Sequence, residues 1–367
     1  MSELLKDIYS PAFYKQFGNV LAEVLPRFDQ RAFEKAIFSD GWEEKALKAR
    51  MKHTALVLRQ YMPERFEAAA DYLVQIITAL RRRGVQENSF VYMFFPDYIE
   101  MYGLDHYDVA VKSIEQVTQF TSCEFAVRPF IIRYGDKMMR QMYRWSEHDS
   151  HLVRRLSSEG SRPRLPWAMA IPALKKDPRP TLPILENLKC DSSEFVRRSV
   201  ANHLNDISKD HPAIVVGLAR QWKGMGKETD GIIKHACRTL LKQGHPEVLK
   251  LYGLNGADLA VLRFKVVTPV VKEGGFLEFS FTVQNNGKKP QPVRLEYGVY
   301  YRKKSGELSR KVFKISEGVL AAGEKKVVER RHSFKRITTR VYYAGGHGVS
   351  VIVNGREGVV KGFELVV

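Results

Sequence analysis

Apolar residues recur at three- and four-residue steps through the first two thirds of the chain, interrupted by Gly, Pro and Asp. This spacing is typical of amphipathic helices. We predict helices over 42–62, 65–84 and 106–120. In the second of these, arginines occupy 81–83 and Gly84 follows. The cations suit the negative end of a helix dipole, and the glycine suits a C-cap.

From residue 259 onward the pattern changes to short runs that alternate apolar and polar residues or are rich in β-branched residues. Glycine-containing turns such as NNGKK and AAGE separate the runs. Seven or eight such strands in about 109 residues predict an antiparallel sandwich of immunoglobulin-like size. No Cys or Trp lies in this stretch, so the Cys–Trp–Cys signature of true immunoglobulin domains is absent. The runs are LRFKVVTPVV, FLEFSFTVQN, PVRLEYGVYYR, RKVFKIS, KKVVERRHSF, TTRVYYAGG, HGVSVIVNG and KGFELVV.

A degenerate repeat runs through the second half of the helical region. The segments SHLVRRLSSEG, SEFVRRSVANHL and DGIIKHACRTLL align at Val153, Val196 and Ile233, which are 43 and 37 residues apart. Two helices in roughly 40–47 residues is the period of HEAT and armadillo repeats, which stack into a curved solenoid. Basic or basic-capable pairs follow the aligned positions and would form a stripe on the stack. The pairs are Arg154-Arg155, Arg197-Arg198 and Lys234-His235. The alternative is that the pairs are solvated helix faces and the three matches are chance.

The change of pattern divides the chain into two predicted domains. The fold class is therefore two-domain α + β, with an all-α HEAT-like helical-repeat solenoid over 1–254 and an antiparallel Ig-like β-sandwich over 259–367. The segment GLNGA (253–257) is the expected hinge. A length of 367 residues fits two domains or three.

Lys and Arg total 59 against 41 Asp and Glu, a formal net charge of +18. On a chain with 44% hydrophobic residues this excess points to a polyanionic partner, with nucleic acid ahead of an anionic membrane. Residues 255–367 hold 21 basic and 10 acidic residues, so the predicted sandwich is the more basic domain. KRITTR (335–340) and an AGGHG loop (344–348) are candidate DNA contacts there. The loop is equally well explained as an ordinary hairpin tip.

Several classes of protein are disfavoured. No run of 18 apolar residues suggests a spanning helix, and the N-terminus has no apolar secretory segment. Cys123, Cys190 and Cys237 are far apart and odd in number, which fits a reducing cytosol and neither a disulfide framework nor a zinc knuckle. HExxH, P-loop and Rossmann motifs are absent. We expect a cytoplasmic protein with no metal, no cofactor and no membrane contact.

Residues 121–170 contain the candidate chemistry, although each residue alone has a simpler explanation. Glu124 follows Thr121 at the spacing of a capping box. Glu159 follows Arg155 at the i,i+4 spacing of a surface ion pair, which contributes only about 0.3–0.5 kcal/mol.

Pro166 is expected at the first position of a helix, with Trp167 behind it as a packing residue. Taken together, however, two carboxylates and an indole lie in one 44-residue segment of the predicted repeat stack. Successive helix ends of such a stack meet at one groove. Carboxylates and an aromatic face suit a cationic ligand or transition state.

At these residues the sequence resembles a known family. EFAVRPF (124–130) and RRLSSEGSRPRLPWA (154–168) are similar to motifs of the bacterial DNA alkylation-repair glycosylases built from HEAT-like repeats, the AlkC/AlkD family. The similarity is closest to the AlkC branch, some members of which carry a C-terminal Ig-like domain. The helical resemblance covers roughly 1–254, and its second motif is the more specific part.

The resemblance implies a monofunctional DNA glycosylase that acts in base excision repair. It would excise cationic N-alkylated bases such as 3-methyladenine and 3-methylcytosine from duplex DNA, without flipping the base into a deep pocket. It assigns the catalytic roles to Glu124, Glu159 and Trp167 and a phosphate contact to Arg155. All four residues are of the expected type. Further candidate DNA-binding residues are Arg154, Arg162, Arg164, Arg198, Lys234 and His235. The expected partner is double-stranded DNA containing alkylated bases, and we expect a monomer.

Two other functions are compatible with the same sequence. A non-catalytic HEAT scaffold for nucleic acid needs the basic pairs but not Glu124 or Glu159. A protein-interaction scaffold needs neither, since helical repeats and Ig-like domains both bind proteins.

Overall fold

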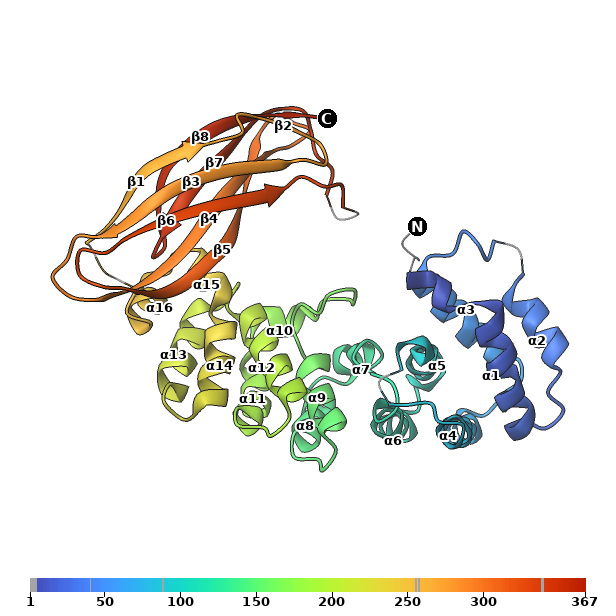
Figure 1. Cartoon of the computed structure of the whole chain (residues 1–367). Coiled ribbons are helices and arrows are strands. Elements are labelled where there is room, and N and C mark those ends of the chain that lie inside the picture. The colour runs from blue at the N-terminus through green and yellow to red at the C-terminus, as the bar shows by residue number, and fades with distance from the viewer. Residues whose placement is uncertain (1–4, 40, 88, 255, 257, 338–339) are drawn as a thin grey trace. The chain divides into compact units, whose positions relative to one another are not determined.

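The computed structural model in Figure 1 describes residues 5–39, 41–87, 89–254, 256, 258–337 and 340–367. Helices occupy the chain up to Leu251, and strands occupy it from Leu259. This order confirms the predicted fold class. The expected hinge at 253–257 includes positions 255 and 257, which lie outside the described residues. Among the described helices none is long and apolar enough to cross a membrane.

The N-terminal helices match the apolar spacing of the sequence. They are η1 (Leu5–Ile8), α1 (Pro11–Val24), α2 (Gln30–Ile37), α3 (Leu47–Arg59), α4 (Phe66–Arg82), η2 (Phe90–Tyr92), α5 (Phe94–Gly103) and α6 (Tyr107–Thr118). The end of α4 is the one predicted. Gly84 adopts φ +82°, and the amides of Gly84 and Val85 donate to the carbonyls of Arg81 and Leu80. This is a Schellman motif, which requires a residue that tolerates the left-handed region.

The remaining helices carry the repeat. They are α7 (Val127–Tyr134), α8 (Asp136–Trp145), α9 (His151–Gly160), α10 (Pro172–Lys176), η3 (Arg179–Thr181), α11 (Leu182–Leu188), α12 (Glu194–Ile207), α13 (Pro212–Trp222), α14 (Lys227–Ala236), α15 (Arg238–Lys242) and α16 (Pro246–Leu251). The three aligned segments fall on α9, α12 and α14, and α12 packs against both of the others. Their aligned residues Val153, Val196 and Ile233 are all buried.

The first arginine of two basic pairs has the same structural role in successive repeats. Arg154 Nη1 and Arg197 Nη1 each donate to the carbonyls five and six residues earlier in the chain, at distances of 2.7–2.9 Å. Each arginine thereby ties the connection before its helix to the first turn of that helix. The repeated hydrogen bonds show that the sequence alignment reflects a repeated structure.

The chain folds into two compact units. One contains residues up to 210 together with 224–236, and the other contains 211–223 together with 237–367. Helices α13, α15 and α16 therefore group with the strands. Within this second unit, a Cβ on Gly244 would lie 2.8 Å from the carbonyl oxygen of Gly355, so the α15–α16 connection contacts the β7–β8 turn closely. The sequence pattern places these helices with the solenoid because periodicity reports local conformation and not packing.

The strands form two sheets. They are β1 (Leu259–Val266), β2 (Val270–Lys272), β3 (Phe276–Asn285), β4 (Gln291–Arg302), β5 (Leu308–Leu320), β6 (Lys325–Ser333), β7 (Gly345–Val353) and β8 (Arg356–Val366). The sheet orders are β1-β3-β6 and β2-β8-β7-β4-β5. All strand pairs are antiparallel except β2–β8, which is parallel. Alternate residues of β3, from Leu277 to Val283, point into the core.

Two expectations for the sandwich are wrong. The TTRVYYAGG run does not form a strand of its own: among its described residues, Arg340 makes an isolated bridge to Ile337, and Gly345 already begins β7. The AGGHG segment is therefore neither a loop nor a hairpin tip. Its glycines pair with β8, and a Cβ on Gly348 would lie 2.8 Å from Val360 Cγ1. Positions 338 and 339 of KRITTR lie outside the described residues.

The last residue of α9 allows α9 to approach α7 closely. A Cβ on Gly160 would lie 2.5 Å from Val127 Cγ1 at the start of α7, so one of the two residues would have to shift. Glu159 and Glu124 lie close to these two positions in the sequence. The absence of a side chain at Gly160 therefore lets the segments that carry the two glutamates pack closely.

We expect Gly160→Ala to lower the free energy of unfolding by about 1–3 kcal/mol because it overpacks this contact. Gly231→Ala, on the exposed side of α14 with open space around the new methyl group, is the control. It should raise that free energy by about 0.5–1 kcal/mol because alanine restricts the unfolded chain. Urea denaturation of both variants measures the difference, and equal effects would contradict the packing argument.

Candidate active site

A pocket of about 420 Å³ lies among the turn before α7, the C-terminal half of α9 and the turn after α9. It contains both glutamates and the tryptophan singled out from the sequence, together with Arg155 and Arg162. The remaining lining is largely apolar and aromatic: Phe90, Met93, Thr121, Ser122, Phe125, Leu165, Pro166 and Phe195. Residues more than 100 positions apart in the chain meet here.

Glu124 lies in the turn before α7, and the capping-box interpretation is wrong. The N-cap of α7 is Ala126, which offers no side-chain hydrogen bond, and Thr121 Oγ1 donates instead to the carbonyl of Ser89 at 3.1 Å. The Glu124 carboxylate accepts from Ser122 Oγ at 2.8 Å and from Arg155 Nη1 at 2.6 Å. It therefore faces the pocket and not the helix terminus.

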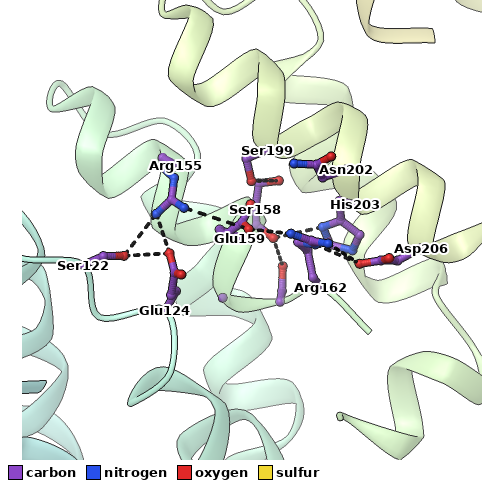
Figure 2. Close-up of polar contacts among 12 residues, drawn as sticks. Ser122, Glu124, Arg155, Ser158, Glu159, Arg162, Ser199, Asn202, His203 and Asp206 are labelled. Carbon is purple, nitrogen blue, oxygen red and sulfur yellow. Dashed lines mark hydrogen bonds and ion pairs between the residues drawn. The ribbon is translucent and has the colours of Figure 1, made fainter. Parts of the chain in front are cut away.

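The glutamates belong to a chain of alternating charges, shown in Figure 2. Arg155 Nη2 lies 3.9 Å from Glu159 Oε1, and Arg162 Nη1 lies 2.5 Å from the same oxygen. Arg162 Nη2 lies 2.7 Å from Asp206 Oδ2 on α12. The chain thus links the turn before α7 to α9 and then to the neighbouring repeat helix.

The side chains in this row of ion pairs are poorly exposed. The exposed fraction is 16% for Glu124, 8% for Glu159, 14% for Arg155 and 7% for Arg162. Burial opposes the charge on Arg162, but Glu159 and Asp206 raise its pKa above the ordinary value. Removing one partner of a buried ion pair costs about 3–5 kcal/mol, because the remaining charge has no counter-ion. The ion pairs thus hold the carboxylates in one geometry.

Trp167 lies at the rim of the pocket and not in a helix, so its expected place behind a helix-starting proline is wrong. Pro166 and Trp167 form a turn, and the next helix, α10, begins at Pro172. Trp167 has φ +65°, a conformation that costs a bulky residue about 1–2 kcal/mol. Trp167 is 65% exposed, which leaves its aromatic ring accessible to a ligand.

A buried arginine that the sequence analysis did not identify holds this turn. Arg128 on α7 is fully buried, and its Nη1 donates to the carbonyls of Gly160 and Arg162 at 2.9 and 2.8 Å. Its Nε donates to the carbonyl of Met169 at 2.7 Å. Burial and the nearby Arg162 lower its pKa to about 10. Because its partners are distant backbone carbonyls, no local sequence signal could have revealed this role.

The packing of α12 on α9 also depends on buried polar groups. His203 on α12 is fully buried, and its Nδ1 donates to the carbonyl of Ser158 at 2.9 Å. Burial and the positive charge of Arg162 lower the pKa of His203 to about 3. His203 is therefore neutral, and it lies near the row of ion pairs without adding a charge to it.

The other predicted DNA-binding residues differ in availability. Arg154 makes a bidentate ion pair with Asp191, and Arg164 makes one with Asp210. Arg198 is 65% exposed, with Glu194 at 2.7 Å. Arg198 and His235 line a groove of about 510 Å³ between α12 and α14, whereas Lys234 is exposed but does not line it. The groove lining is Glu194, Arg197, Arg198, Ala201, Asn202, Lys227, Glu228, Gly231, Ile232 and His235.

A second pocket, of about 230 Å³, lies beside the first and shares Phe125 with it. Asp97 and Glu100 of α5 line it, with Lys48 and Lys52 of α3. Burial and the neighbouring Glu100 raise the pKa of Asp97 to about 7, although both lysines act in the opposite direction. The described residues contain no cluster of His, Cys, Asp and Glu that could hold a metal ion.

Comparison with known proteins agrees with this geometry. Residues 45–218 match the sequence profile of the family described as "DNA alkylation repair enzyme", and residues 260–367 match that of "Uncharacterised protein YhaZ, C-terminal Ig-like domain". The "Uncharacterized protein YhaZ" of Bacillus subtilis (strain 168) is 43% identical over 352 residues, which are 96% of either chain. The chain belongs to the DNA alkylation repair enzyme family. The predicted family is thereby confirmed.

A solved structure places the chain within this family. It is that of the Pseudomonas fluorescens alkylpurine DNA glycosylase AlkC, bound to DNA containing an abasic site analog. The two chains are similar over 100% of each, with 35% sequence identity and a TM-score of 0.93. This DNA alkylation repair enzyme is therefore of the AlkC branch, with the Ig-like domain that some members carry.

We expect Asp97→Asn to stabilise the protein at high pH only. An acid whose folded pKa is raised keeps its proton in the folded state while the unfolded chain has lost it, so folding stability falls as pH rises from about 4 to 7. At pH 8 the variant should be more stable by about 1–2 kcal/mol, with solvent screening allowed for. Near pH 3.5 the difference should vanish.

Urea titrations at both pH values measure this effect, and Asp71→Asn on the exposed side of α4 is the control. A gain of equal size at both pH values would show that burial of Asp97 is not its cause.

Proposed function

We propose that the protein is a DNA glycosylase that hydrolyses the N-glycosidic bond of cationic N-alkylated bases in duplex DNA, as a step of base excision repair. We propose 3-methyladenine and 3-methylcytosine as its substrates. The observation that carries the proposal is the placement of Glu124, Glu159 and the exposed indole of Trp167 in one pocket. The likeness to a DNA-bound alkylpurine glycosylase supports it.

The chemistry of such a lesion matches what this pocket offers. An N3-alkylated base already carries a positive charge, so it is a good leaving group and needs no general acid. Cleavage develops a second cation on the sugar, which has oxocarbenium character. Fixed negative charge and aromatic faces stabilise cations at lower cost than a reorganising solvent does. A deep pocket that encloses a flipped base is not required.

Each catalytic residue has a distinct contribution in this proposal. Glu124 and Glu159 stabilise the developing charge on the sugar, and one of them orients or deprotonates the attacking water. Trp167 offers its face to the lesion nucleoside by a cation–π contact. Arg155 lies between the two carboxylates and also 4.3 Å from the ring of Phe195, and we assign it a phosphate beside the lesion.

DNA binding would extend from the pocket to the groove between α12 and α14. Arg198 and His235 offer cationic or hydrogen-bonding groups there, and phosphate contacts of this kind supply most of the affinity in protein–DNA complexes. We propose that residues 1–254 form the glycosylase domain and that the basic sandwich of 259–367 adds DNA contacts. We further propose a cytoplasmic monomer that associates with the nucleoid through DNA.

We expect Glu124→Gln and Glu159→Gln each to lower the single-turnover rate of 3-methyladenine release by about 100-fold or more, because each removes fixed charge at the developing cation. Affinity for duplex DNA should be unchanged or slightly higher, since a negative charge near phosphate is lost. Glu147→Gln, an exposed carboxylate between α8 and α9, is the matched control.

Release from methylated DNA and fluorescence anisotropy with a labelled duplex measure the two effects. Tight DNA binding by the wild type without base release would instead favour the non-catalytic scaffold. Weak, salt-insensitive DNA binding would favour a protein-interaction scaffold.

Arg198 and Arg154 should respond differently to replacement by alanine. Arg198→Ala should weaken duplex binding and reduce the slope of log K against log salt by about one, because one phosphate contact is lost. Arg154→Ala should leave the slope unchanged and lower the free energy of unfolding, because its guanidinium pairs with Asp191 and two carbonyls. Salt titrations and urea denaturation separate the two outcomes, and identical slopes for the wild type and Arg198→Ala would reject the groove as a phosphate site.

A further inference from the structure

The side chain of Lys48, at the start of α3, contacts the Trp167 turn from a position 119 residues earlier in the chain. Its Nζ donates a hydrogen bond to the carbonyl oxygen of Trp167. The same ammonium lies 4.5 Å from the centroid of the Phe125 ring. Lys48 therefore contacts two residues that line the first pocket: the ring of Phe125 and the backbone of Trp167.

The second pocket places two carboxyl groups near this lysine. Lys48 and Lys52 both line it and both lower the pKa values of Asp97 and Glu100 through their charge. The Lys48 side chain thus lies in a pocket that also contains two carboxyl groups of α5, while its ammonium donates to the Trp167 carbonyl. Because Phe125 lines both pockets, it forms part of the wall between them.

The Trp167 turn needs such an external support. Trp167 has a left-handed backbone conformation and is 65% exposed, so packing of its side chain contributes little to holding the turn. Arg128 fixes the carbonyls of Gly160, Arg162 and Met169, which flank the turn on both sides. Lys48 fixes the carbonyl of Trp167 itself.

We propose that Lys48 is a positioning residue of this site: through the Trp167 carbonyl it holds the indole at the rim of the catalytic pocket. Lys48 is not a phosphate ligand in this scheme, and it touches neither the lesion nor the water. The structural part of the proposal concerns the turn alone. The catalytic part rests on the proposed glycosylase function.

The first test does not depend on activity. The full chain labelled with 5-fluorotryptophan gives one ¹⁹F resonance for each of its 4 tryptophans, and Trp167→Phe identifies that of Trp167. Lys48→Met should shift or broaden this resonance and leave the other three in place. Lys52→Met is the matched control, because Lys52 lines the same pocket and faces the same acids. An unchanged Trp167 resonance in Lys48→Met would overturn the proposal.

The second test measures how the lysine acts. Lys48→Met should lower the single-turnover rate of 3-methyladenine release about tenfold. It should change the affinity for abasic-site DNA by less than about twofold and leave the salt slope unaltered. Lys48→Arg should restore most of the rate, since it keeps a donor and a charge. In the Trp167→Ala background, Lys48→Met should have an effect of less than about twofold.

Each alternative has its own signature. A salt slope reduced by about one in Lys48→Met would make Lys48 a phosphate ligand and overturn the proposal. Equal rate losses in the wild-type and Trp167→Ala backgrounds would also overturn it, because the lysine would not act through the tryptophan. If the wild type releases no alkylated base, the proposed function fails, and the ¹⁹F measurement alone decides whether Lys48 positions Trp167.

Discussion

The site depends on one physical constraint: charges removed from water must be paired. Glu124, Arg155, Glu159, Arg162 and Asp206 alternate in sign and join the turn before α7, helix α9 and helix α12. Each carboxylate lies beside a guanidinium, and Glu159 and Asp206 offset the cost of burying the Arg162 charge. The close packing at Gly160 and the carbonyl contacts of Arg128 bring the backbone into the geometry that this pairing requires.

This arrangement separates two electrostatic tasks. The net charge of +18 favours binding to a polyanion, and we propose that the exposed Arg198 contributes to this binding within the helical repeats. The pocket instead contains acidic residues, Glu124 and Glu159, which the positive net charge of the whole chain does not reveal. A cationic lesion in a polyanionic duplex requires both tasks, since the duplex must be held while the positive leaving group and sugar are stabilised. In the proposed function, the exposed side chain of Trp167 completes a site that needs no enclosing cavity.

Much of this could be predicted from local sequence signals, and the rest could not. Apolar spacing predicted α3, α4 and α6, and the Val153–Val196–Ile233 alignment predicted helices that share a fold and a buried position. The two glutamates and Trp167 were identified from motif spacing and family resemblance, and the structure brings them into one pocket. Predictions from local sequence failed where a residue's contact partner lies far away in the sequence. Thr121 bonds to Ser89 and not to Glu124, Trp167 lies in a turn, and the glycines near 345 pair with β8. Arg128 and Lys48 act on backbone carbonyls, which carry no residue-specific signal in the sequence.

The central claim is that this pocket cleaves bases that are already cationic, by stabilising positive charge without activating the leaving group. The most direct measurement compares single-turnover release of 3-methyladenine and of uracil by the full chain, from otherwise identical duplexes at one salt concentration. We expect release of the cationic base and no detectable release of the neutral one. Comparable release of both bases, or release of uracil alone, would contradict this claim.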